Sequence, residues 1–163
     1  MKKITIYTLI ALLGVLTSFK PKDKKEAELK WYDWNEGYSI AAKKKKLILV
    51  DVFTSWCGWC KKMDKDTYED ADVKGRLNKD FVAVKLNPEK AGVTYKLDTM
   101  SVTGRQLLDI LTNYNNNGYP TTIIVDPKKN EVLQIYAGYQ DPAQFKKSIE
   151  TVLAAKAEKK KGN

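Results

Sequence analysis

The sequence predicts an α/β domain built as a three-layer sandwich, in which helices cover both faces of one mixed β-sheet. Strand-like apolar runs alternate with helix-like amphipathic stretches along most of the 163 residues, and strands that helices separate tend to pair in parallel. The last two strand-like runs flank a short turn, which predicts an antiparallel C-terminal hairpin. A single domain accounts for the chain, since domains typically contain about 100–200 residues.

The first residues of the chain predict a secretory signal peptide over residues 1–19. Lys2 and Lys3 form a short basic start, and an apolar run over residues 4–16 follows; export signals share this arrangement. The run is shorter than the about 20 apolar residues that span a membrane, although an uncleaved membrane anchor and a buried helix remain alternatives. We therefore expect the folded part to be periplasmic or otherwise exported, after cleavage between residues 17 and 21.

Charge divides the remainder into a linker at residues 20–30, a folded domain at 31–155 and a basic flexible tail at 156–163. The net charge of +9 lies mostly at the two ends, because segment 31–155 contains 18 basic and 16 acidic residues. A nucleic-acid binder normally carries its basic residues on the folded body. We therefore expect no nucleic-acid partner, and we interpret the excess of lysine as solvated chain ends.

The folded domain is predicted to begin with a capped helix and a buried strand. Asp33 and Glu36 have the spacing of a capping box for a helix over residues 34–45. Residues 47–53 form a near-continuous apolar run with several β-branched side chains, which is typical of a strand buried on both faces. Asp51 interrupts this run, and a carboxylate at a buried position needs either a partner or a chemical role.

The alternation of helices and strands continues to the end of the domain. Residues 87–102 have no clear pattern and are expected to be mostly loop. Asp141 and Pro142 have the residue types of an N-cap and a first helical position. The remaining predicted elements are a helix from Cys57 to about Tyr68, a short helix near 72–78, a strand at 81–86, a helix from Thr103 to about Asn115, strands at 121–125 and 131–136, and a final helix from Asp141.

The counts of cysteine and histidine restrict the possible chemistry. The chain has no histidine and only two cysteines, which excludes Ser-His-Asp triads, Cys-His proteases and His-ligated zinc or haem. Zinc needs about four ligands, so we expect no metal site. Two cysteines are also too few for a disulfide-based scaffold.

The pattern Cys57-Gly58-Trp59-Cys60 is the candidate reactive centre. Cys57 follows a buried strand and begins a helix, where unpaired backbone N–H groups and the helix dipole stabilise a thiolate. The thiolate is the attacking species in disulfide exchange. Gly58 allows the turn and leaves room for a substrate, and Cys60, one helical turn further, is expected to be buried and to resolve a mixed disulfide. A purely structural disulfide is the alternative.

The segment from Leu49 to Lys61 resembles the active-site segment of the thioredoxin superfamily. The shared features are an apolar strand with an acid, an aromatic residue, Trp-Cys-Gly-x-Cys and a lysine, with six residues from Asp51 to Cys57. Two further segments, Val84-Lys85-Leu86-Asn87 and Gly118-Tyr119-Pro120-Thr121, resemble the strand that supplies a lysine near that acid and the loop whose proline is cis. The resemblance covers about residues 31–155. As an exported single-domain chain, the protein is similar to the envelope thioredoxin-like proteins of bacteria.

This resemblance implies roles for further residues. Asp51 would accept the proton of Cys60, and Lys85 would moderate the charge of Asp51; a merely structural ion pair is the alternative. Tyr119 would offer its backbone to a substrate chain beside a cis Pro120. The list of implied substrate-binding residues is Trp56, Gly58, Trp59, Tyr119 and Pro120.

Two departures from thioredoxin itself affect these expectations. Trp59 replaces a proline between the cysteines, which leaves the redox potential open. The segment from Asn87 to Tyr119 is longer, and residues 87–102 form either a partner-selecting loop beside the active site or a neutral insertion.

The residues and the resemblance together predict a protein thiol:disulfide oxidoreductase of the cell envelope. The resemblance implies that strong oxidants commonly have a histidine between the cysteines, and this chain has none, which favours the reductase or isomerase side. We expect protein disulfides as substrates, a membrane partner as electron donor, a monomer, and no cofactor beyond the Cys57–Cys60 disulfide. Alternatives are a non-catalytic binding or chaperone module of the same fold and a peroxidase.

Overall fold

A computed structural model describes residues 28–161 of the chain. The predicted signal peptide at 1–19 and most of the linker at 20–30 lie outside the described residues. The elements are β1 (Trp31–Tyr32), α1 (Trp34–Lys44), β2 (Leu47–Val52), α2 (Gly58–Asp66), α3 (Ala71–Asp80), β3 (Phe81–Leu86), β4 (Thr94–Leu97), β5 (Met100–Thr103), α4 (Gly104–Leu111), β6 (Thr121–Asp126), β7 (Glu131–Ala137) and α5 (Pro142–Lys161).

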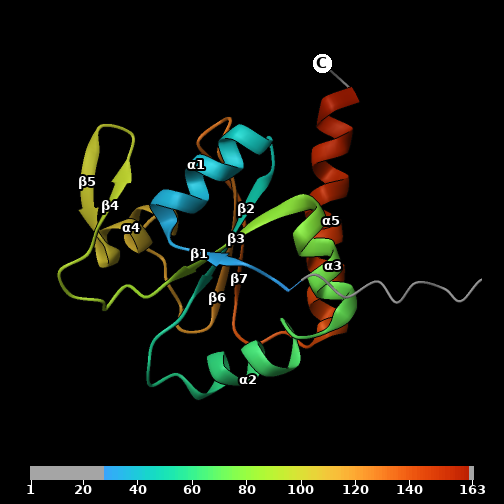
Figure 1. Cartoon of the computed structure of the whole chain (residues 1–163), viewed down its shortest axis with the longest axis horizontal. Coiled ribbons are helices and arrows are strands. Elements are labelled where there is room, and N and C mark those ends of the chain that lie inside the picture. The colour runs from blue at the N-terminus through green and yellow to red at the C-terminus, as the bar shows by residue number, and fades with distance from the viewer. Residues whose placement is uncertain (1–27, 162–163) are drawn as a thin grey trace, which may run out of the picture.

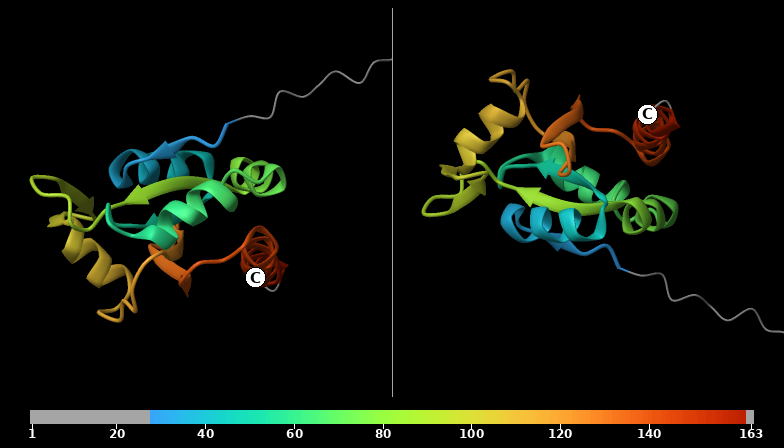
Figure 2. Two further views of the ribbon diagram at one scale, coloured as in Figure 1. Left: turned by 90° about the horizontal axis from the view of Figure 1, so that it is seen from below. Right: turned by 90° about the horizontal axis from the view of Figure 1, so that it is seen from above.

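The predicted fold class is confirmed: a five-stranded mixed sheet lies between two layers of helices (Figures 1 and 2). The strand order is β1-β3-β2-β6-β7, with β1, β3 and β2 parallel to one another. β6 is antiparallel to β2, and β7 pairs with β6 as the predicted C-terminal hairpin.

Alternate residues of the central strand β2 face two separate apolar clusters. Ile48 and Val50 pack on the side of α1 and α4, where Trp34 is fully buried. Leu47 and Leu49 pack on the other side, with α2, α3 and α5. Every residue of β2 is buried, as the near-continuous apolar run predicted, and its carboxyl end points to the start of α2.

Helix α1 begins and ends as the sequence predicted. The Asp33 carboxylate accepts a hydrogen bond of 2.9 Å from the backbone N–H of Glu36, which satisfies one of the free donors of the first turn. Lys45 follows the helix with its backbone in the left-handed region, at a φ of 56°. Its N–H donates hydrogen bonds to the carbonyls of Ala41 and Ala42 in the last turn. This reversal leads the chain directly into β2.

The segment 87–102 is not mostly loop, because residues 94–103 form a separate hairpin, β4–β5. Tyr95 and Val102 are opposite each other in this hairpin and are both buried against the core, against which the partly buried Leu97 also packs. The indole N–H of Trp34 donates to the carbonyl of Lys96 at 2.9 Å. Four-residue strands with one buried side chain each are too short for an alternation that the sequence alone would reveal.

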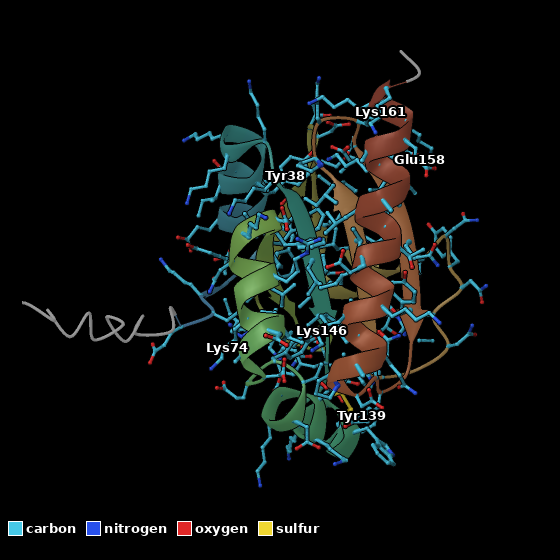
Figure 3. All side chains as sticks on the ribbon, turned by 90° about the vertical axis from the view of Figure 1, so that its right-hand side faces the viewer. Tyr38, Lys74, Tyr139, Lys146, Glu158 and Lys161 are labelled. Atoms are coloured by element: carbon cyan, nitrogen blue, oxygen red, sulfur yellow. A yellow bond between two sulfur atoms is a disulfide. The ribbon has the colours of Figure 1, made fainter. Side chains whose placement is uncertain are left out.

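Two helices end at other positions than expected. α4 stops at Leu111 rather than near Asn115, because Asn113 and Tyr114 have φ of 49° and 60°, outside the helical region. α5 continues to Lys161, so residues 156–161 of the expected flexible tail are helical. Lys156 forms an ion pair of 3.1 Å with Asp126, which holds this last part of α5 to the β6–β7 turn. Figure 3 shows α5 lying along the sheet from the side of Tyr139 to Lys161.

No helix in the described range has the length and apolar character that crossing a membrane requires.

Two helical glycines offer a matched test of the packing of α1. A Cβ at Gly37 would lie 2.3 Å from Cγ2 of Val84, whereas a Cβ at Gly75 would meet nothing within 4 Å. Gly37→Ala is expected to lower the free energy of unfolding by about 1–3 kcal/mol, the usual cost of overpacking. Gly75→Ala is expected to raise it by about 0.5–1 kcal/mol, since alanine is the better helix former. Urea unfolding of both variants measures the difference, and equal effects would contradict the close contact of α1 with β3.

Candidate active site

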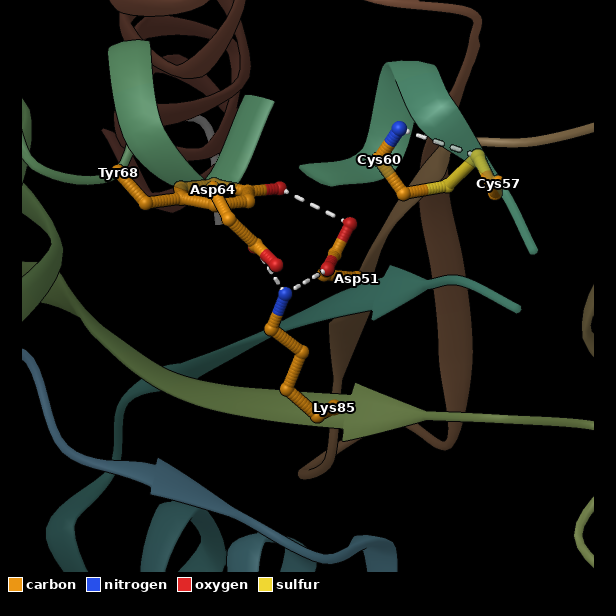
Figure 4. Close-up of polar contacts among 6 residues, drawn as sticks. All are labelled: Asp51, Cys57, Cys60, Asp64, Tyr68 and Lys85. Carbon is orange, nitrogen blue, oxygen red and sulfur yellow. Dashed lines mark hydrogen bonds and ion pairs between the residues drawn. A yellow bond between two sulfur atoms is a disulfide. The ribbon is translucent and has the colours of Figure 1, made fainter. Parts of the chain in front are cut away.

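Cys57 and Cys60 form a disulfide at the start of α2 (Figure 4). Cys57 is the N-cap residue, with extended backbone, and the backbone N–H of Cys60 points at its Sγ at 3.0 Å. The two Cα atoms are 5.3 Å apart. The sulfur of Cys57 therefore lies where a helix start supplies a hydrogen-bond donor and positive potential, which stabilise a thiolate once the disulfide is reduced.

The disulfide is recessed between two exposed tryptophans. Cys57 and Cys60 are 5% and 3% exposed, whereas Trp56 and Trp59 are 65% and 58% exposed. A Cβ added at Gly58 would meet no atom within 4 Å, so the space over the motif is open. The two exposed indoles, which directly precede the two cysteines in sequence, form an aromatic rim beside the disulfide that an approaching macromolecule can contact.

The loop before β6 lies next to the rim. The Tyr119-Pro120 peptide bond is cis, and the carbonyl of Pro120 accepts a bond of 2.8 Å from the N–H of Gly138. The ring of Tyr119 meets that of Trp56 edge-on, with centroids 5.8 Å apart. Two residues predicted from separate parts of the sequence, Trp56 and Tyr119, are thus neighbours.

Sequence reasoning missed two further contacts of the rim. The indole N–H of Trp56 donates to the carboxylate of Glu89 at 3.0 Å, and the ring of Tyr139 lies 5.4 Å from that of Trp59. Glu89 belongs to segment 87–102, for which a place beside the active site was one of the two expectations, but nothing in the sequence distinguishes it there from Asp98. Tyr139 directly follows Gly138 after the last strand, where no motif singles it out.

Asp51 lies on the face of the sheet that α2 covers, and its side chain is buried, with 1% exposure. Lys85 stands opposite Asp51 on β3, and its Nζ donates to Oδ2 at 2.5 Å. The hydroxyl of Tyr68 donates to Oδ1 at 3.2 Å. Lys85 also forms an ion pair with Asp64 of α2, so one ammonium serves two carboxylates (Figure 4). The expected contact of Asp51 with Lys85 is present.

The surroundings of Lys85 explain how a lysine can be mostly covered. Its Nζ lies over the rings of Trp31, Phe53 and Tyr68, at 4.6, 5.1 and 5.3 Å from their centroids. Such cation–π contacts favour the charged form of the ammonium. Asp64 and Tyr68 escaped sequence reasoning; Asp64 follows Cys60 by four residues, the helical spacing that places both on one side of α2.

Burial raises the pKa of Asp51 above the ordinary value of an aspartate, while the charge and hydrogen bond of Lys85 and the bond from Tyr68 oppose this rise. The net direction is upward because the carboxylate has lost almost all of its contact with water. Burial also raises the pKa of Tyr68 well above its usual value, and the neighbouring charge of Asp51 adds to this. Tyr68 therefore stays a hydrogen-bond donor, and Asp51 is the group of the pair that can exchange a proton.

The raised pKa of Asp51 predicts how stability changes with pH. The folded state holds the Asp51 proton at pH values where the unfolded chain has released it, so this group lowers stability as pH rises from about 4 through the folded pKa. Asp51→Asn removes that effect, and Lys85 retains Asp64 as a partner. We expect the variant to gain stability relative to wild type from pH 4 to pH 8, by about 1.4 kcal/mol for each unit of pKa difference. Urea unfolding at several pH values measures the gain, and a constant difference would contradict the raised pKa.

No group of three or more histidine, cysteine, aspartate or glutamate side chains among residues 28–161 is placed to hold a metal ion. The chemistry that the arrangement supports is that of the disulfide itself. The described site contains the Cys57–Cys60 pair with the spacing of a Cys-x-x-Cys motif and the aromatic rim. It also contains the buried carboxyl group of Asp51, which Lys85 and Tyr68 contact.

Solved structures of thioredoxin-like proteins resemble this fold. A thioredoxin from Thermus thermophilus superimposes with a TM-score of 0.62 at 22% identity, over 78% of this chain and 88% of that one. A proposed disulphide-isomerase from Bacteroides thetaiotaomicron superimposes with a TM-score of 0.56 at 29% identity, over 74% and 88%. The similarity to the Thermus thioredoxin shows the fold alone. The Bacteroides protein shares a larger fraction of identical residues with this chain.

Sequence relatives include a thiol:disulfide interchange protein DsbD from Colwellia psychrerythraea. It is 24% identical over 108 residues, which are 66% of this chain and 16% of that protein. The chain spans only about 8–17% of the length of the curated relatives it matches, so their activities as whole proteins are not transferred.

A family model covers all of the described residues. The model named Thioredox_DsbH, with the description "Protein of unknown function, DUF255", matches residues 17–161. The match includes the disulfide, its aromatic rim and the buried Asp51–Lys85 pair. With a thioredoxin-like fold and a Cys-x-x-Cys pair at the start of a helix, the chain belongs to this thioredoxin-like DsbH family.

Proposed function

We propose that the protein is a thiol:disulfide oxidoreductase that reduces or isomerises disulfides of protein substrates in the cell envelope. The observation that carries the proposal is the position of the Cys57–Cys60 disulfide, which lies at a helix start between two exposed tryptophans. A structural disulfide has no need of an exposed aromatic rim, and such a rim is suited to a protein surface.

The reaction begins from the reduced cysteine pair. The Cys57 thiolate attacks one sulfur of a substrate disulfide, forms a mixed disulfide and releases the other substrate sulfur as a thiolate. Cys60 then attacks Sγ of Cys57, which restores the Cys57–Cys60 disulfide and releases the second substrate sulfur. Two electrons pass to the substrate, which gains two protons, and the cysteine pair is oxidised.

Asp51 is the group that accepts the proton of Cys60 in the second step. Its carboxyl is buried on the side of the sheet that α2 covers, and burial raises its pKa. A base with a raised pKa accepts a proton near neutral pH more readily than an ordinary carboxylate. Lys85 and Tyr68 hold the carboxyl group in place through their hydrogen bonds to its two oxygens.

The direction of electron flow follows from the charges near Cys57. The sequence contains no histidine, so no imidazolium stabilises the Cys57 thiolate, and Asp51 adds negative charge when it is ionised. A less stabilised thiolate makes the pair more reducing. We therefore place the protein on the reductase or isomerase side, with a membrane protein as its source of electrons, as a monomer whose export depends on the signal at residues 1–19.

The test is the dithiothreitol-driven reduction of insulin together with a trapping experiment. The wild-type protein is expected to accelerate insulin reduction, and Cys60→Ser is expected to accumulate mixed disulfides that dithiothreitol releases. In Cys60→Ser the first exchange proceeds and the second cannot. Gly75→Ala, on α3 and outside the site, adds a methyl group that meets open space and is the matched control. Absence of both acceleration and trapping would reject the proposed function in favour of a non-catalytic module.

A further inference from the structure

A groove of about 660 Å³ lies at the end of the sheet opposite to the disulfide. Its walls come from the end of α1, the turn between β6 and β7, strand β7 and the second half of α5. Figure 3 shows the relation along α5, whose beginning is near Tyr139 and whose end is Lys161. Tyr139 contacts the aromatic rim, whereas the groove is beside the far half of the helix, so the two sites are separate.

The floor of the groove is apolar. Ala41, Leu133, Val152 and Ala155 line it. Leu133 occupies a β-bulge, because Gln134 and Val132 are opposite the consecutive residues Ile124 and Val125, which leaves Leu133 as an extra residue. A bulge re-aims the local side chains of an edge strand. Here the bulge lies at the groove, which the half-buried Leu133 lines.

The rim of the groove is strongly basic. Seven lysines and only two acidic residues line it, and one of these acids, Asp126, is already paired with Lys156. Lys46 donates to a backbone carbonyl of α3. Apart from Lys46, the lysines of the rim that form no ion pair with an acid within residues 28–161 are Lys45, Lys128, Lys129, Lys159 and Lys160.

Floor and rim together select the class of ligand. A small hydrophilic anion would leave the apolar floor in contact with water, and a neutral hydrocarbon would leave the lysine charges without a partner. The volume lies within the about 300–1,000 Å³ of small-molecule sites, and a charged head at the rim would meet several ammonium groups at once.

We propose that this groove binds an amphiphilic anion, a molecule with one hydrocarbon chain on the apolar floor and a phosphate or carboxylate head at the lysine rim. The proposal does not depend on the disulfide chemistry, because no residue of the redox site lines the groove. It gives the domain a second binding site on the face away from its protein substrates.

The experiment measures binding of monomeric dodecyl phosphate to the full chain by isothermal titration calorimetry, below the concentration at which the amphiphile forms micelles. Laurate replaces it in a second arm, to separate a phosphate from a carboxylate head. Inorganic phosphate and dodecyl maltoside supply the head alone and a neutral amphiphile. We expect binding of at least one of the two anionic amphiphiles, and at least tenfold weaker binding of both control compounds.

Two pairs of variants locate the site. Ala155→Trp fills the groove and is expected to weaken binding at least tenfold, whereas Ala154→Trp, on the same helix but outside the groove, is expected to leave it unchanged. The charge reversal Lys129→Glu with Lys160→Glu is expected to weaken binding similarly. Lys90→Glu with Lys147→Glu changes the net charge equally at residues that do not line the groove, and is expected to have little effect.

Several results would overturn the proposal. These are the absence of binding by both anionic amphiphiles, equal binding of dodecyl maltoside, equal binding of inorganic phosphate, or equal effects of Ala155→Trp and Ala154→Trp. Binding to vesicles of phosphatidylglycerol without binding of the monomeric amphiphiles would also reject it, in favour of a membrane surface. Insulin reduction, measured in parallel, is expected to be unchanged in Ala155→Trp, so failure here is distinct from failure of the redox function.

Discussion

Cys57→Ser is expected to reduce the rate of insulin reduction by about a thousandfold or more, to the rate of dithiothreitol alone. The serine hydroxyl stays protonated at neutral pH and forms no disulfide, so the first exchange has no nucleophile. Cys60 is not expected to replace Cys57, because it lies inside the first turn of α2, whereas Cys57 is the N-cap residue whose sulfur the backbone N–H of Cys60 faces. The loss is thus expected to be complete even though one thiol remains.

The measurement needs a control for folding, since the variant also lacks the disulfide. Cys57→Ser should unfold in one transition and retain the circular dichroism of the reduced wild-type protein. Gly75→Ala is the matched active variant, because its added methyl group meets open space on α3, outside the site. If Cys57→Ser retained activity at the level of Gly75→Ala, Cys57 would not be the nucleophile.

Lys85→Met is expected to lower the free energy of unfolding by about 2–3 kcal/mol at pH 8. The change removes the ammonium that faces buried Asp51 at 2.5 Å and leaves a side chain of similar volume among the same rings. Loss of one partner of a buried ion pair costs about 3–5 kcal/mol. We expect the lower figure because the Lys85 side chain is 21% exposed, and water moderates the effect.

The signature of this effect is its pH dependence. Without Lys85 the pKa of Asp51 rises further, because the charge that lowered it is gone. Asp51 then keeps its proton at low pH, and the penalty appears as the pH rises through the new pKa. The loss should therefore be small at pH 4 and full at pH 8. Adding Asp51→Asn should restore most of the lost stability at pH 8, and a loss equal at both pH values would exclude Asp51 as its origin.

The sequence predicted those parts of the fold that have a strong local signal. The run at 47–53 is long and apolar, and Asp33 has the residue type and spacing of an N-cap, so β2 and α1 are near their predicted bounds. The hairpin β4–β5 and the two-residue strand β1 escaped because each depends on contacts distant in the sequence. Trp34 contacts β4 through one hydrogen bond to the carbonyl of Lys96. No sequence pattern near either residue predicts that contact.

The candidate site divides in the same way. The cysteines, Asp51 and Lys85 form motifs with fixed spacing, and the structure brings Asp51 and Lys85 together. Asp64, Tyr68, Glu89 and Tyr139 join the site through tertiary contacts alone. An isolated acid or tyrosine on a helix or loop has many possible positions in space, so its sequence position predicts no contact.

The single polar side chain of β2 has a consequence for how the sheet assembles. Every residue of this strand is buried, and both faces are apolar, so hydrophobicity alone distinguishes poorly between alternative registers of β2 against β3. A slip of one residue would turn Asp51 toward the cluster under α1 and α4, away from Lys85, and leave a carboxyl group among hydrocarbon. The Asp51–Lys85 pair thereby specifies the alignment of the central strands and contributes to the uniqueness of the fold.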